Sequence, residues 1–370
     1  MDSKKKNTFI ASLITIHAIQ NFGSSLQTIA TCNILRNLGI KPLVINYIRP
    51  RDRLLYLLFD IFKEKSVFLS IKLLFIFPYQ FYIQNKFDKY LKKYCILTKP
   101  IYTNDDFLSK CPKTDFYITG SDQVWNVQYN GGVDTRYFWQ GIKGPKISFA
   151  SSLGNCELTE DEKKNYPTLL SDYKAISVRE SSAKKSLEDI GFHVTHVLDP
   201  TMMFNRYEWQ QYASPRLVKQ PYIYVYLPYN TENIAMIYKS IRKIAAKRFL
   251  KVVTSKLSSF SKERYADETF CFCNPSDFIS LMTNAEYVVT SSFHGAAFAI
   301  NLNKQFWVYM PSKFSSRISS IINLCGLQTR ILTSEIMESQ IYEVIDYNQV
   351  NAILENERDK TMDFLKEALL

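Results

Sequence analysis

The segment Ser291–Gly295, with the sequence SSFHG, combines residue types that can bind and protonate a small anion. It follows the apolar run Tyr287–Thr290, so we predict that a strand ends here and a helix begins. The N-terminus of that helix would offer backbone N–H groups to a phosphate or carboxylate. A nearby dianion favours the charged form of His294, which can then donate a proton. A helix-capping turn with a packed histidine is the alternative interpretation.

An arginine at the end of a second apolar run is the next candidate for anion chemistry. Arg179 directly follows Ala175–Val178, and its planar guanidinium group suits a carboxylate or phosphate. The alternative is a surface arginine that begins a helix beside Glu180. Arg317 and Arg330 can also hold an anion, although each alone fits a solvated surface residue better.

The segment Gly120–Asn126, with the sequence GSDQVWN, is rich in groups that suit a sugar. Its Asp, Gln and Asn side chains can exchange hydrogen bonds with hydroxyls. The aromatic face of Trp125 can stack on a sugar ring. A tight turn with a buried tryptophan is the alternative, and we favour the binding interpretation.

Apolar runs alternate with helical patterns along the chain, which is typical of βα units around a parallel sheet. In open sheets of this kind ligands bind outside the carboxyl ends of the strands, where nearly every polar cluster of this sequence falls. The predicted strands of the first half are Phe9–Ile16, Leu43–Tyr47, Phe116–Thr119, Lys146–Ala150, Ala175–Val178 and Val194–Leu198. The pattern restarts with the predicted strands Tyr222–Leu227, Leu250–Thr254, Tyr287–Thr290 and Phe306–Tyr309.

The length of 370 residues and the hydrophobic content of 46% indicate two domains. We place the first at 1–210 and the second at 211–370, with a boundary in Arg206–Gln220. Predicted helices run over Leu26–Leu38, Thr231–Phe249 and, at the end of the chain, Val350–Leu369. The fold class is therefore α/β, with two doubly wound domains.

Several common signatures are missing from the sequence. Asn21–Gln27 opens a predicted helix as a phosphate-contacting loop does, but it lacks the three-glycine dinucleotide fingerprint. We find no Walker loop, no Gly-x-Ser-x-Gly elbow and no Asp-x-Asp motif. The sequence therefore predicts no metal requirement.

The net charge of +11 fits nucleic acid, an anionic membrane surface or a phosphorylated substrate. No known nucleic-acid-binding signature is present, so we expect no nucleic-acid partner. Seven cysteines without a Cys-x-x-Cys pair indicate free thiols in a reducing cytoplasm. The N-terminal apolar run lacks a cleavage site and is predicted to be a strand.

Residues 49–99 interrupt the alternation with a basic, aromatic and leucine-rich segment. They hold 11 Lys or Arg against 4 Asp or Glu. Such a helical segment can lie in a membrane interface, which would make the protein peripheral on the inner face of the cytoplasmic membrane. The alternative is that these helices pack on the sheet.

At these residues the chain resembles the polysaccharide pyruvyl transferases. The resemblance covers roughly residues 8 to 330, and the combination of GSDQVWN with SFHG carries most of its specificity. The matching stretches are Asn21–Gln27, Gly120–Asn126, Ser148–Gly154, Ile176–Glu180, Asp199–Thr201, Thr290–Gly295 and Ser316–Leu327. The resemblance implies a GT-B-like fold, with two Rossmann-like domains facing a central cleft. It also implies phosphoenolpyruvate as the donor substrate, with no further cofactor.

The resemblance assigns the catalytic roles to His294 and Arg179. It places the acceptor, a lipid-linked or polymeric saccharide, on the first domain and the donor on the second. Many members carry an arginine two residues before the histidine, where this chain has Ser292, so we expect Arg317 to supply the missing cation. The predicted donor-binding residues are Ser291, Ser292, Gly295, Arg317, Asn21, Gly23 and Ser24. The predicted acceptor-binding residues are Ser121, Asp122, Gln123, Trp125, Asn126, Ser151 and Ser152.

The implied activity is transfer of the pyruvyl group of phosphoenolpyruvate to a sugar diol of a surface polysaccharide or its precursor. Asp122 is one candidate for the base that accepts the hydroxyl proton. A nucleotide-sugar glycosyltransferase on the same scaffold is one alternative, although no acidic ribose-binding residue or base-binding slot is evident. A non-catalytic, membrane-associated scaffold built on residues 49–99 is another.

Overall fold

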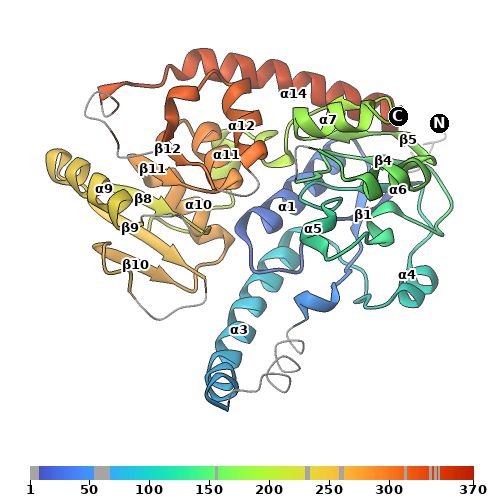
Figure 1. The fold of residues 1–370 in the computed structure, drawn as a ribbon, viewed down its shortest axis with the longest axis horizontal. Coiled ribbons are helices and arrows are strands. Elements are labelled where there is room, and N and C mark those ends of the chain that lie inside the picture. Colours follow the sequence, from blue (N-terminus) through green and yellow to red (C-terminus); the bar gives the residue numbers. More distant parts are fainter. Residues whose placement is uncertain are drawn as a thin grey trace, which may run out of the picture. The chain divides into compact units, whose positions relative to one another are not determined.

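The computed structural model describes residues 8–53, 67–154, 157–229, 234–257, 262–311, 315–332, 336, 340 and 342–370, with the backbone alone for 67–76. The chain divides into two compact units (Figure 1). Unit 1 comprises Met1–Phe81, Asp88–Pro200 and Lys360–Leu370, and unit 2 comprises Tyr82–Phe87 and Thr201–Asp359. The two units divide between Pro200 and Thr201, whereas the predicted boundary is at 210. The last eleven residues of the chain belong to unit 1.

Unit 1 contains a five-stranded parallel sheet in the order β2-β1-β3-β4-β5, and a parallel pair of β6 and β7. Its strands are β1 (Ile10–Ile14), β2 (Lys41–Val44), β3 (Phe116–Thr119), β4 (Lys146–Ser148), β5 (Tyr173–Ala175), β6 (Ser177–Val178) and β7 (Thr195–His196). Its helices are α1 (Phe22–Asn37), α4 (Asn104–Lys110), α5 (Val127–Asn130), α6 (Glu160–Leu170) and α7 (Ser181–Glu188), with the 3-10 turns η1 (Pro50–Asp52) and η2 (Thr135–Phe138).

Unit 2 contains a six-stranded parallel sheet in the order β10-β9-β8-β11-β12-β13. Its strands are β8 (Tyr222–Tyr226), β9 (Lys251–Lys256), β10 (Glu268–Cys271), β11 (Tyr287–Thr290), β12 (Gln305–Tyr309) and β13 (Ile331–Leu332). Its helices are α8 (Arg206–Gln210), α9 (Ile234–Arg248), α10 (Pro275–Asn284), α11 (Phe293–Asn301) and α12 (Ser315–Leu324), with the 3-10 turn η4 (Gln328–Arg330).

Three elements have residues in both units or at their junction. They are the turn η3 (Pro200–Met202) and the helices α3 (Val67–Tyr94) and α14 (Tyr347–Leu369).

The strand order of each sheet locates the place where a ligand is expected. In unit 2 the order runs 3-2-1-4-5-6 in chain sequence, the order of Rossmann folds, and it reverses between β8 and β11. In unit 1 the order 2-1-3-4-5 reverses between β1 and β3. Open α/β sheets bind ligands at such switch points, outside the carboxyl ends of the two strands. The loops after β1, β3 and β11 are therefore the expected sites.

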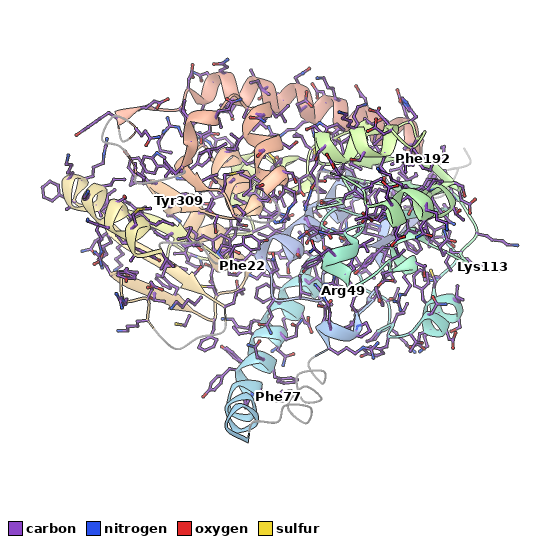
Figure 2. All side chains as sticks on the ribbon, viewed as in Figure 1. Phe22, Arg49, Phe77, Lys113, Phe192 and Tyr309 are labelled. Atoms are coloured by element: carbon purple, nitrogen blue, oxygen red, sulfur yellow. The ribbon has the colours of Figure 1, made fainter. Side chains whose placement is uncertain are left out.

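Each sheet is covered by side chains of its own unit. The core of unit 1 includes Ile14, Ile45, Trp139 and Val178, and that of unit 2 includes Ile223, Ile241, Val289 and Trp307. Helix α9 contacts β8 and β9, and α11 contacts β11 and β12. Figure 2 shows the density of side chains around the ribbons, with Tyr309 of β12 labelled.

The structure confirms the predicted alternation and corrects several bounds. Helix α1 begins at Phe22 rather than Leu26, because the side chain of Asn21 accepts a hydrogen bond from the N–H of Ser24 and caps the helix. The run Ala175–Val178 divides between β5 and β6, which lie in different sheets. Strands β10 and β13 were not predicted. The start of the predicted helix Thr231–Phe249 lies outside the described residues.

In the segment 49–99, residues 54–66 lie outside the described part of the chain. Helix α3 buries Ile83, Phe87 and Leu91 at helical spacing, as the packing interpretation expects, while Phe81 and Tyr82 are exposed. Among the described residues, no helix is both long and apolar enough to cross a membrane. Membrane contact by this segment stays a prediction.

Candidate functional site

The switch point of unit 2 is formed by the ends of β8 and β11. Thr290 pairs with Tyr226 in register, and the Thr290 hydroxyl donates to the Tyr226 carbonyl at 2.8 Å. Ser292 then caps α11, since its hydroxyl accepts a hydrogen bond from the N–H of Gly295 at 3.4 Å. The predicted strand–loop–helix order is therefore present, and the N-terminus of α11 lies where a ligand is expected.

Two side chains at this turn are suited to a polar ligand. The Ser291 hydroxyl is fully buried and has no hydrogen-bond partner among the described residues. His294 is the second residue of α11 and is 7% exposed, and its ring meets that of Phe293 edge to face at 5.0 Å between centroids. A buried hydroxyl without a partner is costly unless a ligand or water completes it.

Gly295 allows α11 to start this close to the strand. A Cβ atom at this position would lie 2.1 Å from the Thr290 hydroxyl oxygen and 2.9 Å from its Cβ. That same hydroxyl also accepts from the N–H of Ser292 at 3.1 Å, so it cannot move without breaking the turn.

We predict that Gly295→Ala lowers the free energy of unfolding by about 1–3 kcal/mol through overpacking. Urea denaturation measures the loss, and hydrogen exchange locates it in the β11–α11 turn. Thr290→Ala removes two of the three contacting atoms. The double variant should therefore lose less stability than the sum of the single variants. Additive losses would contradict the contact as the cause.

The predicted auxiliary cations of unit 2 are both buried. Arg317 is 3% exposed on α12, a helix that contacts α11. Arg330 is 2% exposed in η4 and donates to the carbonyl of Glu343 at 2.8 Å. Burial lowers the pKa of Arg330. The role of Arg317 in donor binding stays a prediction, and neither arginine is the solvated surface residue considered as the alternative.

The switch point of unit 1 brings together the loops after β1 and β3. The hydroxyl of Ser24, in the first turn of α1, donates a short hydrogen bond to the Asp122 carboxylate. Thr15 also crosses between the loops, because its hydroxyl donates to the carbonyl of Ser121 at 2.6 Å. Asp122 has a φ of +76°, a conformation that costs a non-glycine residue energy and often marks a functional position.

Arg179 lies inside a cage of carboxylates and not on an open surface. Its guanidinium group has no exposed surface and contacts Asp199 at 2.8 Å, Glu180 at 3.1 Å and Asp122 at 3.5 Å. Burial disfavours the charge, but the three carboxylates outweigh it and raise the pKa of Arg179 above its ordinary value. The guanidinium group and its three carboxylates together carry a formal charge of 1 − 3 = −2.

This geometry changes the interpretation of Arg179. In the described conformation the guanidinium group has no exposed surface, so direct contact with a donor stays a prediction. Its ion pairs with Asp122 and Asp199 also suit a second role, in which Arg179 positions Asp122 and the loop after β7. Its backbone also takes part, because the N–H of Arg179 donates to the Ser151 carbonyl at 3.3 Å.

Several predicted acceptor-binding residues hold the loops together. The Ser152 hydroxyl donates to Glu180 at 2.6 Å, and the Ser121 hydroxyl donates to Asp199 at 2.7 Å. Ser151 donates to the carbonyl of Gly120 at 3.1 Å. Hydrogen bonds between the loops therefore engage all three hydroxyls.

Trp125 corrects the sugar-stacking prediction. It is 1% exposed, stacks on Phe138 at 5.6 Å between centroids and donates from Nε1 to the Tyr137 carbonyl at 3.2 Å. Asn126 is also fully buried, caps α5 and donates to the side chain of Gln123 at 2.7 Å. The tight turn with a buried tryptophan, considered as the alternative, describes this part of the loop.

Other residues of this site were not singled out from the sequence as site residues. Gln27 donates to the Thr15 hydroxyl at 2.9 Å and to the Ser24 carbonyl at 3.0 Å. The only sequence signal for Thr15 is a polar residue inside an apolar run. His17, at the end of the same run, bonds to Asn46 at 3.2 Å, and burial lowers its pKa. The Asp199–Thr201 stretch drew attention to Asp199 in the sequence, but it did not reveal that Asp199 pairs with Arg179.

Within the described residues, no group of three or more His, Cys, Asp or Glu side chains is placed to hold a metal ion. The six cysteines of that part of the chain are free thiols.

Two doubly wound parallel-sheet units, each with a polar loop at its switch point, define an α/β protein with a GT-B-like fold. A crystal structure of UDP-N-acetylglucosamine 2-epimerase has a TM-score of 0.53 and 11% identity, covering 98% of this chain and 95% of the other. The structure of Arabidopsis thaliana UGT89C1 has a TM-score of 0.52 and 10% identity, covering 98% and 100%. These similarities establish the fold alone.

Within that fold class the chain belongs to the polysaccharide pyruvyl transferase family, whose model matches residues 21–312. The match includes the loops after β3 and β11, with Asp122 and His294 among their residues. No curated protein matches the chain at a significant level.

Proposed function

We propose that this protein transfers the pyruvyl group of phosphoenolpyruvate to two hydroxyls of a sugar in a surface polysaccharide or its lipid-linked precursor. The family match over residues 21–312 carries the proposal. The position of His294 at the start of α11, beside the end of β11, supports it. The basic segment 49–99 is suited to bring the protein to a membrane-bound acceptor.

The proposed reaction has a simple balance. The methylene carbon of phosphoenolpyruvate gains a proton, which makes C2 electrophilic. One sugar hydroxyl attacks C2, the bond from C2 to the phosphate oxygen breaks, and a second hydroxyl closes the ketal. Of the two hydroxyl protons released, one replaces the proton given to the methyl group and the other leaves with phosphate.

Each protein group has a proposed role in this scheme. His294 donates the proton to the methylene carbon or assists departure of phosphate. The N-terminus of α11 and the Ser291 hydroxyl supply hydrogen bonds to the anionic donor. In unit 1, Asp122 is the candidate base for the sugar hydroxyl, held by Ser24 and Arg179.

The test is incubation of the full chain with 2-¹³C-labelled phosphoenolpyruvate and saccharide extracts of the source cell. We expect phosphate release that depends on the acceptor, together with a ¹³C signal of a ketal carbon. A panel of nucleotide sugars run in parallel tests the glycosyltransferase alternative. Release of a nucleoside diphosphate without any phosphate from phosphoenolpyruvate would overturn the proposal.

A further inference from the structure

A polar cavity lies in unit 1, apart from Arg179 and its carboxylates. Its volume is about 230 Å³, and it is lined by residues of η1, of the end of α5 and the loop after it, and of η2. Three of its lining residues are arginines, namely Arg49, Arg51 and Arg136. Figure 2 labels Arg49. Gly132, also in the lining, has open space on the side where a Cβ would project.

The deepest of the three arginines has donor capacity to spare. Arg49 is 3% exposed, yet its Nη2 atom has no hydrogen-bond partner among the described residues. Its Nε is paired with Asp52, and its Nη1 donates to the side chain of Asn130 at 2.6 Å. A buried guanidinium nitrogen without an acceptor is unfavourable, so an anion in the cavity would relieve it.

The other two arginines are also only partly engaged. Arg136 contacts Asp134 through Nε at 2.6 Å, and Arg51 donates from Nη1 to the carbonyl of Tyr129. Arg51 Nε is also ion-paired with Asp52 at 3.7 Å, and no hydrogen bond to the described residues is made by Arg51 Nη2 or by the two Nη atoms of Arg136. Arg49 and Arg51 both lie over the ring of Tyr129, at 5.1 and 4.2 Å from its centroid. The ring therefore holds two of the cations close together.

The charge of the cavity selects an anion. Three arginines face the two carboxylates Asp52 and Asp134, which gives a formal charge of 3 − 2 = +1. A carboxylate ligand offers two oxygens, whereas a terminal phosphate group offers three and can accept from three separate guanidinium groups. The arrangement therefore fits a phosphate group better.

The cavity is joined directly to the loop after β3. Asn130, which accepts from Arg49, donates to the carbonyls of Gln123 at 3.2 Å and Val124 at 2.9 Å. Asn126 of the same loop caps α5, the short helix that ends at Asn130. A phosphate in the cavity would thus lie one helical turn from the residues that follow Asp122.

We infer that Arg49, Arg51 and Arg136 form a phosphate-binding subsite in unit 1, separate from any site for phosphoenolpyruvate. The subsite binds the phosphate group of the acceptor or of a membrane lipid. The inference holds whether or not phosphoenolpyruvate is the donor, because none of the three arginines takes part in the proposed reaction.

The experiment measures binding of three probes to the full chain by calorimetry and co-sedimentation. The probes are inorganic phosphate, glucose 1-phosphate and vesicles containing phosphatidic acid. Tighter binding of glucose 1-phosphate than of inorganic phosphate identifies a sugar phosphate as the source. Binding to vesicles alone identifies a lipid headgroup. Absence of binding to all three probes overturns the inference.

Variants locate the binding. Arg136→Gln should lower the affinity for the probe about tenfold or more, because each hydrogen bond between charged groups contributes roughly that factor. Arg36→Gln, an exposed arginine of α1 in the same unit, makes the same charge change and should bind as the parent does. Equal weakening by both variants would mean a diffuse charge effect and would overturn the subsite.

A second pair of variants guards against misfolding. Val133 lines the cavity and is 36% exposed, so Val133→Asp introduces a negative charge at little cost to packing. It should abolish binding, whereas the neutral Val133→Asn should retain most of it. Binding by Val133→Asp at the parental affinity would place the phosphate elsewhere. Phosphate release from phosphoenolpyruvate, measured in parallel, separates failure of this inference from failure of the proposed function.

Discussion

His294→Asn is expected to fold as the parent does and to reduce phosphate release from phosphoenolpyruvate by about 10²–10⁴-fold. Asparagine keeps a polar side chain of similar reach, but it cannot transfer a proton. Since His294 is the second residue of α11 and Ser292 caps that helix, the substitution leaves the capping hydrogen bond in place. Initial rates at saturating acceptor measure kcat, and circular dichroism checks the fold.

The matched control is His193→Asn, an exposed histidine of unit 1. It should retain full turnover. A general acid must be protonated to act, so the parent should lose activity on the alkaline side of its pH profile. Any residual activity of His294→Asn should not show this loss at alkaline pH. Parental turnover of the His294 variant would exclude the residue from the chemistry.

The sequence located the loops because each follows a short apolar run that must be buried in a parallel sheet. Ser291–Gly295 and Gly120–Asn126 were placed correctly at strand ends by that signal alone. Strands β10 and β13 escaped it, since β10 is only half-buried and β13 has two residues. Helix α1 starts earlier than predicted because Asn21 caps it, and the pattern of apolar residues does not indicate that cap.

Side-chain partners were harder to predict than positions. The sequence predicts a ligand contact for Arg179, and nothing near it in sequence, except Glu180, reveals the carboxylates that surround it. Asp122 and Asp199 reach it only through the packing of β3, β6 and the loop after β7. The sequence does not predict the arginine cavity for a similar reason. Arg49 and Arg51 belong to the basic segment 49–99, while Arg136 lies far along the chain.

Arg179→Ala is expected to lower the free energy of unfolding by about 3–5 kcal/mol, the cost of removing one partner from a buried ionic cluster. Three carboxylates that lie within 3.5 Å of the guanidinium group would then lose their ion pairs with it. Hydrogen exchange should show the loss in β1, β3 and β6, and should leave the strands of unit 2 unchanged. Lys163→Ala, which breaks the exposed ion pair with Glu160, should leave stability unchanged.

The same variants distinguish a positioning role from direct donor binding. If Arg179 acts through its carboxylates, Arg179→Ala combined with Asp199→Asn should recover part of the lost stability, because one of the carboxylates that lost its ion pair with Arg179 is neutralised. Arg179→Lys should keep the charge, lose the fork geometry and fall between the parent and the alanine variant. If Arg179 instead binds the donor, its variants should remain stable and raise KM for phosphoenolpyruvate. That result would support the donor contact, and it would require the guanidinium group to leave Asp199 and Glu180 during the reaction.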